Sequence, residues 1–96
     1  MKMRNYITLA TTDARKVQGF INWMNSVDSF EYASVTGRDA DGCISVQLNH
    51  DRNCGFDCSI DLRSGTWQKR WFDHQDATVH SWTAPMRLNS FEPVNS

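Results

Sequence analysis

The residues best suited to chemistry form one cluster, His50-x3-Cys54-x3-Cys58. Imidazole and thiolate groups are the ligands that zinc prefers. A zinc knuckle, however, places its cysteines in a turn and adds a second ligand pair, and nothing in the sequence brings His74 or His80 close to this cluster. A free cysteine usually behaves as a small buried hydrophobe. We therefore interpret the cluster as structural and predict no metal or other cofactor.

A cysteine nucleophile is the second chemistry to consider. Cys54 lies near His50 and Asp51 in a polar connection, so the three residue types of a catalytic triad are present. Sequence neighbours on one turn do not form a triad, and no glycine pattern of a nucleophile elbow surrounds them. The sequence does not favour a cysteine enzyme.

The carboxylates suggest no catalytic pair or ion site either. Asp57 and Asp61 share one face of a predicted strand and would lie about 13–14 Å apart, which is too far for a glycosidase pair. Residues 39–42 begin like a calcium loop, but Cys43 and His50 occupy the positions where that loop needs ligands. Glycine-rich phosphate-binding motifs are also missing from the sequence. We expect a protein that is not an enzyme.

Cations and aromatic rings are mixed in one segment, Trp67 to Phe72, which includes Lys69, Arg70 and Trp71. Such a mixture can stack bases and hold phosphates. It is equally typical of an amphipathic strand whose indoles lie in the core. Ten basic and eleven acidic residues give a net charge of −1, which disfavours a strongly basic nucleic-acid binder. Direct nucleic-acid binding through this segment is the alternative function.

The elements that position these residues indicate an α+β fold. Apolar residues recur at helical spacing over about 12–27, and alternation predicts strands elsewhere. We expect a four- to five-stranded antiparallel sheet with this one amphipathic helix packed on one face. The predicted strands cover 5–11, 30–38, 43–49, 55–62 and 67–72, although the last segment also fits a helix.

The C-terminal third is harder to interpret. Residues 73–82 can form a short second helix that begins at Asp73. From Thr83 the composition shifts toward proline, asparagine and serine, which favours an irregular segment. The predicted organisation is one α+β domain over 1–84 and an irregular tail over 85–96.

Cysteine content and the N-terminus bear on location. The chain has three cysteines, an odd number that fits a reducing compartment better than a disulfide scaffold. The basic residues at the start precede no apolar segment of signal-peptide length, and no segment is long enough to span a membrane. We expect a cytoplasmic protein that does not bind membranes.

These observations favour a small interaction protein that binds a macromolecular partner and modulates or inhibits it. Phages and mobile elements encode proteins of this kind, including inhibitors of a host enzyme or defence complex. The expected partner is a protein or a protein–nucleic acid complex, and the oligomeric state stays open. The predicted partner-binding residues are tryptophan, basic and acidic side chains, since tryptophan and arginine are frequent in interface hot spots. They are Trp67, Lys69, Arg70 and Trp71 in one patch, with Asp57 and Asp61 on the polar face of the sheet.

Overall fold

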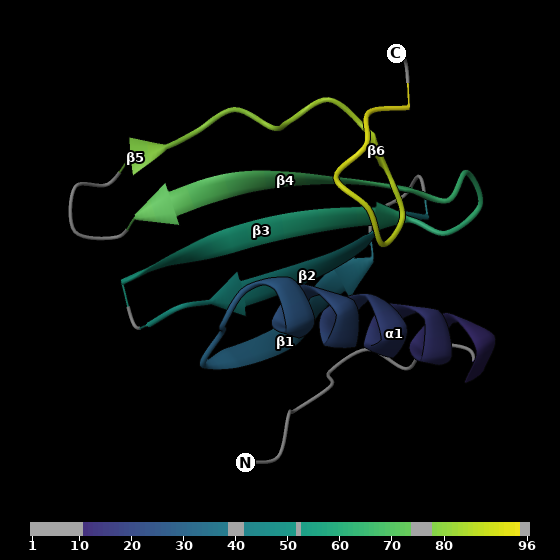
Figure 1. Cartoon of the computed structure of the whole chain (residues 1–96), viewed down its shortest axis with the longest axis horizontal. Coiled ribbons are helices and arrows are strands. Elements are labelled where there is room, and N and C mark those ends of the chain that lie inside the picture. The colour runs from purple at the N-terminus through teal and green to yellow at the C-terminus, as the bar shows by residue number, and fades with distance from the viewer. Residues whose placement is uncertain (1–10, 39–41, 52, 74–77, 95–96) are drawn as a thin grey trace.

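The computed structural model describes residues 11–38, 42–51, 53–73 and 78–94. In this part of the chain one helix precedes six strands (Figure 1). The elements are α1 (Thr11–Val27), β1 (Tyr32–Arg38), β2 (Ile44–Asn49), β3 (Cys54–Asp61), β4 (Thr66–Asp73), β5 (Thr78–Val79) and β6 (Met86–Arg87). The predicted α+β fold with one N-terminal helix and an antiparallel sheet is confirmed. The strand predicted over 5–11 lies outside the described residues, except for Thr11, which begins α1.

The sheet is a simple meander. The strand order is β1-β2-β3-β4-β5, every pair is antiparallel, and β6 also pairs with β4. The register places Val46 opposite Cys58, and Cys58 opposite Lys69. Because side chains alternate between the faces of a strand, this register fixes which residues share each face.

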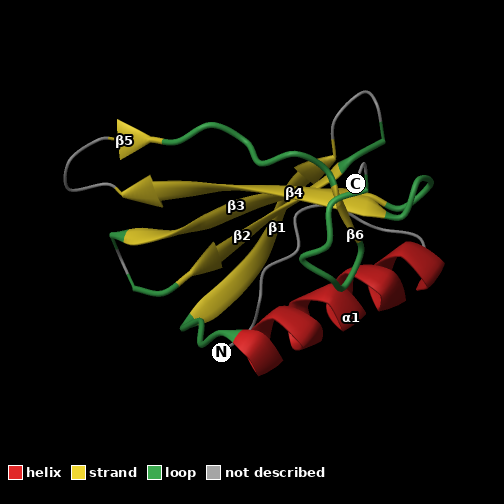
Figure 2. Cartoon of the chain, turned by 45° about the horizontal axis from the view of Figure 1, so that its top comes forward, coloured by secondary structure: helices red, strands yellow, loops and turns green. Residues whose placement is uncertain are grey.

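The helix covers one face of the sheet (Figure 2). The side of α1 that faces the sheet carries Val17, Phe20, Ile21 and Met24, all of them buried. The helix-facing side chains of the sheet form the rest of the core, because alternate strand residues turn toward α1. They include Val35, Ile44, Val46, Leu48, Cys58, Ile60 and Trp67. Within the described residues, no helix combines the length and apolar character needed to cross a membrane.

The short helix predicted over 73–82 is not formed by the described residues of that range. Asp73 ends β4, and Thr78 pairs with it as part of β5. The following residues continue along β4, where the backbone N–H of His80 donates to Trp71 O at 3.2 Å. The edge of β4 offers unpaired backbone groups, and hydrogen bonding to that edge outweighs the weak helical pattern of this segment.

The C-terminal segment, expected to be irregular over 85–96, contains a small hairpin. Met86 pairs with Trp67 of β4 and forms a bridge with Pro93. The indole Nε1–H of Trp67 donates to the carbonyl oxygens of Arg87 at 3.1 Å and of Ser90 at 2.8 Å. A single core side chain therefore fixes both ends of the turn in this hairpin.

Trp67→Phe should destabilise the protein by about 1–3 kcal/mol, because phenylalanine keeps a ring in the core but removes the donor to two carbonyl groups. Urea unfolding measures the change. The matched control is Trp82→Phe, which alters an indole that is 40% exposed and should change stability by less than about 0.5 kcal/mol. Equal losses in the two variants would contradict the role of the Trp67 hydrogen bonds.

Two glycines should respond in opposite directions to alanine. A methyl group on Gly55 would lie 2.1 Å from the carbonyl oxygen of Leu48 and 2.8 Å from Asn49 Cα, whereas a methyl group on Gly19 meets nothing within 4 Å. Gly55→Ala should cost about 1–3 kcal/mol or more through overpacking, and Gly19→Ala should stabilise by up to about 1 kcal/mol through helix propensity. Thermal and urea unfolding test both, and a Gly55→Ala variant as stable as the parent would refute the close approach of β2 and β3.

Candidate functional site

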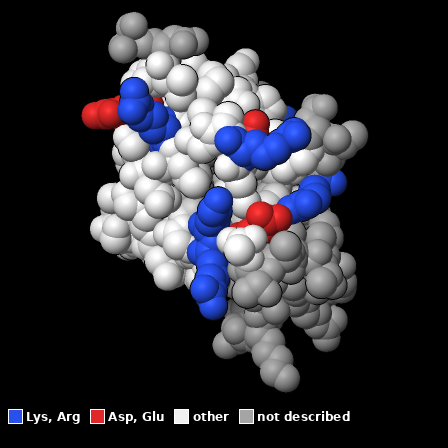
Figure 3. All heavy atoms as spheres, turned by 90° about the vertical axis from the view of Figure 1, so that its right-hand side faces the viewer, with Lys and Arg blue, Asp and Glu red and all other residues white. Residues whose placement is uncertain are grey.

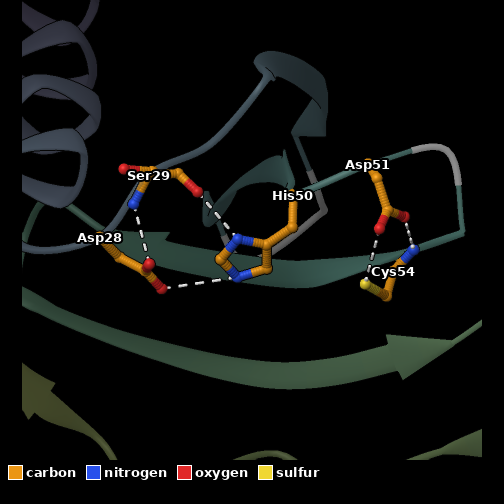
Figure 4. A network of polar contacts seen from close by, with 5 residues as sticks. All are labelled: Asp28, Ser29, His50, Asp51 and Cys54. Carbon is orange, nitrogen blue, oxygen red and sulfur yellow. Dashed lines mark hydrogen bonds and ion pairs between the residues drawn. The ribbon is translucent and has the colours of Figure 1, made fainter.

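The residues of the predicted chemical cluster point to different partners (Figure 4). His50 Nδ1 lies 2.8 Å from Ser29 O, and its Nε2 lies 3.5 Å from an oxygen of Asp28. The Cys54 thiol instead donates to Asp51 Oδ2 at 3.6 Å. The imidazole thus links the end of α1 to the end of β2, and Cys54 belongs to a separate turn.

The electrostatics of that turn oppose nucleophilic chemistry. The backbone N–H groups of Asn53 and Cys54 donate to Asp51 Oδ1 at 2.7 and 3.0 Å, and these bonds lower the pKa of the Asp51 carboxyl group. Desolvation, followed by the charge of Asp51, raises the pKa of the Cys54 thiol. A thiolate is the reactive form of cysteine, so this environment disfavours the reactive form of Cys54.

Cys58 is a core residue. It is 1% exposed, and burial raises the pKa of its thiol to about 12. Among the described residues, no group of three or more His, Cys, Asp or Glu side chains is placed to hold a metal ion. His74, one of the considered ligands, lies outside the described residues, and His80 is exposed.

The predicted basic and aromatic patch is divided between two faces of the sheet. Trp67, Lys69 and Trp71 share the face of β4 that is turned toward α1, and Arg70 lies on the opposite face. Trp67 is 1% exposed and packs against Phe20 with ring centroids 5.0 Å apart. These four side chains therefore do not form one continuous surface.

Lys69 and Trp71 belong to a half-buried aromatic cluster on the helix side. The Lys69 Nζ lies 4.6 Å from the ring centroid of Phe56 and 5.1 Å from that of Phe91. The Trp71 ring is 5.0 Å from Phe56 and 5.8 Å from His50. The rings extend the core toward the end of the sheet where α1 ends.

A different set of residues crosses the opposite face, which α1 does not cover (Figure 2). Gln47 Nε2 donates to Asp57 Oδ1 at 3.3 Å, and Arg70 Nε donates to Asp57 Oδ2 at 3.1 Å. The guanidinium carbon of Arg70 lies 4.6 Å from the ring centroid of Trp82. We call Gln47, Asp57, Arg70 and Trp82 the open-face row. It contains two of the predicted binding residues, Asp57 and Arg70.

The backbone next to Trp82 anchors it to β4. Thr83 N donates to Lys69 O at 2.8 Å, and Lys69 N donates to Thr83 Oγ1 at 3.1 Å. The side chain of Gln68 adds a bond from its Nε2 to Thr83 O at 3.0 Å. Three hydrogen bonds at the following residue therefore fix the backbone beside Trp82, whose side chain is 40% exposed.

A hollow of about 150 Å³ lies beside the open-face row. Small hydroxyl side chains on β1 and β2 line it together with three members of the row, Asp57, Arg70 and Trp82. Its lining residues are Thr36, Ser45, Val46, Asp57, Cys58, Arg70 and Trp82. The hollow can accept one side chain of a partner rather than a metabolite-sized ligand, since ligand pockets usually exceed about 300 Å³.

Asp61, the other predicted residue of the polar face, binds the backbone of the turn that follows it. Its Oδ1 accepts bonds from the backbone N–H groups of Arg63 at 3.0 Å and Ser64 at 3.3 Å. The side chain of Ser64, followed by these backbone donors, lowers the pKa of Asp61. Asp61 thus stabilises the β3–β4 turn and does not join the open-face row.

The end of the molecule near that turn carries charges of both signs (Figure 3). Basic side chains are spread over the surface that the described residues form there, and several have an acidic side chain beside them. One such neighbour pair is the ion pair of Arg38 with Asp13 of α1. This part of the surface does not form a uniform basic patch of the kind that dominates nucleic-acid affinity.

Sequence reasoning missed Trp82 and Gln47 as members of a site. Trp82 falls in the helix predicted over 73–82, and Gln47 is a polar residue of the strand predicted over 43–49. The available signal was weak: Trp82 precedes a Thr-Ala-Pro segment and fits no strong apolar period. Its contact with Arg70 depends on the path of residues 80–85 along β4. No local sequence pattern specifies that path.

No protein-family model matches the chain, and comparisons with curated proteins and with solved structures found no match.

Acid should weaken the β3–β4 turn through Asp61. Because the folded-state pKa of Asp61 lies below its unfolded value of about 3.9, its stabilising contribution is complete above that value and is lost as pH falls through the folded pKa. Asp61→Asn should be less stable at pH 7 and should lose stability less steeply between about pH 4 and pH 2. Urea unfolding across this range tests the prediction, and parallel acid limbs for variant and parent would contradict it.

Proposed function

We propose that this chain is a small, non-enzymatic interaction protein that binds a macromolecular partner through the open face of its sheet and thereby modulates or inhibits it. The observation that carries the proposal is the open-face row: the Trp82 indole contacts the Arg70 guanidinium, which also pairs with Asp57, and the two side chains are 40% and 36% exposed. We expect the protein to act in the cytoplasm on a protein or a protein–nucleic acid complex, as phage-encoded inhibitors of host enzymes or defence complexes do.

The composition and rigidity of the row both support this proposal. Tryptophan and arginine are enriched among residues whose truncation costs most binding energy. Side chains that are already fixed lose little conformational freedom when a partner binds. Asp57 accepts from both Gln47 and Arg70, and a hydrogen bond of Thr83 fixes the backbone next to Trp82, which supports a surface with little conformational freedom to lose on binding.

Direct nucleic-acid binding is the second candidate, and the helix-side cluster is the observation in its favour. Lys69 lies near the rings of Phe56 and Phe91, with Trp71 beside Phe56. Cations next to aromatic rings can bind single strands by charge and stacking. A nucleic-acid complex would weaken steeply with added salt, whereas a docking surface built on Trp82 would respond much less.

Trp82→Ala should reduce partner retention by about 30-fold or more, as expected for a hot spot of about 2 kcal/mol. The measurement is quantitative affinity capture from host lysate followed by mass spectrometry, with melting curves to establish that each variant folds.

The control for this experiment is Phe91→Ala. Phe91 is also a large exposed aromatic residue, at 46%, but it packs against Trp23 and Trp67 on the helix side. A folded Phe91→Ala protein should retain its partner. Loss of the partner in this variant but not in Trp82→Ala would move the binding surface to the helix side and refute the proposal.

A further inference from the structure

We infer that the hollow on the open face receives an uncharged amide side chain, Asn or Gln, of the macromolecular partner. This inference rests on the proposed function and specifies the chemistry of the partner at one point of the interface. It follows from three properties of the hollow: its two charges neutralise each other, its lining offers hydrogen-bond donors beside acceptors, and its volume suits one side chain.

Two charged side chains of opposite sign line the hollow, Asp57 and Arg70. Arg70 Nε lies 3.1 Å from Asp57 Oδ2, so an occupant meets an ion pair and not a single charge. A carboxylate placed there would be attracted by Arg70 and repelled by Asp57, and an ammonium group would meet the reverse. Since neither sign gains a net attraction to offset the loss of its hydration, the hollow favours an uncharged occupant.

The same two side chains keep unused hydrogen-bonding capacity. A carboxylate can accept about four hydrogen bonds, and a guanidinium group can donate about five. Among the described residues, Gln47 and Arg70 donate to the carboxylate of Asp57, and Asp57 accepts from Arg70. An occupant without polar atoms would remove water from this pair and from the hydroxyl groups beside it without replacing those hydrogen bonds, which is unfavourable.

A primary amide is the neutral group that matches an acceptor and a donor lying side by side. Its carbonyl oxygen accepts and its NH₂ group donates, and the two are neighbours in one plane. A hydroxyl group, by contrast, donates and accepts at a single atom. The protein itself contains this type of contact, because Nε2 of Gln47 donates to Asp57 Oδ1 at 3.3 Å. A partner amide would make from outside a contact that Asp57 also makes from within.

The size and the remaining lining of the hollow also suit an amide side chain. Its volume is about 150 Å³, and the half-exposed indole of Trp82 offers an apolar surface for methylene groups. The hydroxyl side chains of Thr36 and Ser45 add further polar partners. Thr36 is the extra residue of the β-bulge between Val35 and Gly37, and bulges often re-aim a side chain at a functional site.

The test uses four tetrapeptides as probes: Gly-Gln-Gln-Gly, Gly-Glu-Glu-Gly, Gly-Lys-Lys-Gly and Gly-Met-Met-Gly. Each is acetylated and ends in an N-methylamide, so that only the Gln peptide carries a primary amide. Proton–nitrogen NMR of the full chain follows the indole N–H signal of Trp82 during each titration. The Gln peptide should bind at least about fivefold more tightly than each of the other three, because it alone is neutral and both donates and accepts.

Two single substitutions should change this preference in opposite directions. Asp57→Asn leaves the charge of Arg70 uncompensated, so the Glu peptide should become the tightest ligand. Arg70→Gln leaves the charge of Asp57 uncompensated, so the Lys peptide should become the tightest ligand. Both side chains lie at the surface, at 27% and 36% exposed, and melting curves establish that each variant folds.

Lys16→Gln is the matched control, since it removes one positive charge from α1, which covers the other face of the sheet. It should leave the preference for the Gln peptide unchanged. The inference would be overturned by a parent that prefers the Glu, Lys or Met peptide, by the same preference in the parent and both charge variants, by a change in Lys16→Gln equal to that in Arg70→Gln, or by no response to any peptide.

Partner retention separates this inference from the proposed function. Retention that depends on Trp82 but stays unchanged in Asp57→Asn and Arg70→Gln would overturn the inference and leave the proposed function intact. Retention that depends on none of the three residues would overturn the proposed function itself.

Discussion

The packing of Trp67 connects the three parts of this molecule. Its ring lies against Phe20 of α1 and 5.9 Å from Trp23, so it joins the helix to the sheet. Its Nε1–H reaches two carbonyl groups of the C-terminal hairpin, which therefore packs onto β4. With the hairpin fixed at one end and β5 at the other, residues 80–85 must follow the edge of β4. That path determines where the side chain of Trp82 reaches the surface. The buried indole of Trp67 therefore influences the position of the exposed indole of Trp82.

Side chains along β4 point alternately to the two faces of the sheet, and this separates the charged residues of the strand. Neighbouring cations in the sequence, Lys69 and Arg70, lie on opposite faces, and each meets a different environment. Lys69 is held near aromatic rings beside the core, whereas Arg70 is held between a carboxylate and an indole on the open face. A segment that looks like one basic and aromatic motif thus contributes to two separate faces of the sheet, and its Arg70 joins the open-face row.

Sequence reasoning recovered the elements whose patterns are strong. The apolar spacing from Val17 to Met24 predicted α1, and the alternation of Phe56, Cys58 and Ile60 predicted β3 and its buried face. The residues after Asp73 were misread because their conformation is set by hydrogen bonds to β4, a long-range interaction with no local pattern. The candidate site could be predicted only in part for the same reason: Asp57 and Arg70 lie on regular strands, and Trp82, which contacts Arg70, does not.

The two edges of the sheet differ in how far other segments cover them. β4 is covered along its length by β5, residues 80–83 and β6, while β1 is the outermost described strand on the other side. The pairing of β1 with β2 shifts between Val35 and Gly37, which is a β-bulge. Bulges twist an edge strand and break the regular spacing that another chain needs to add to it. The irregularity in β1 thus disfavours regular backbone pairing with a further strand along this edge, so the bulge opposes edge-to-edge association of sheets.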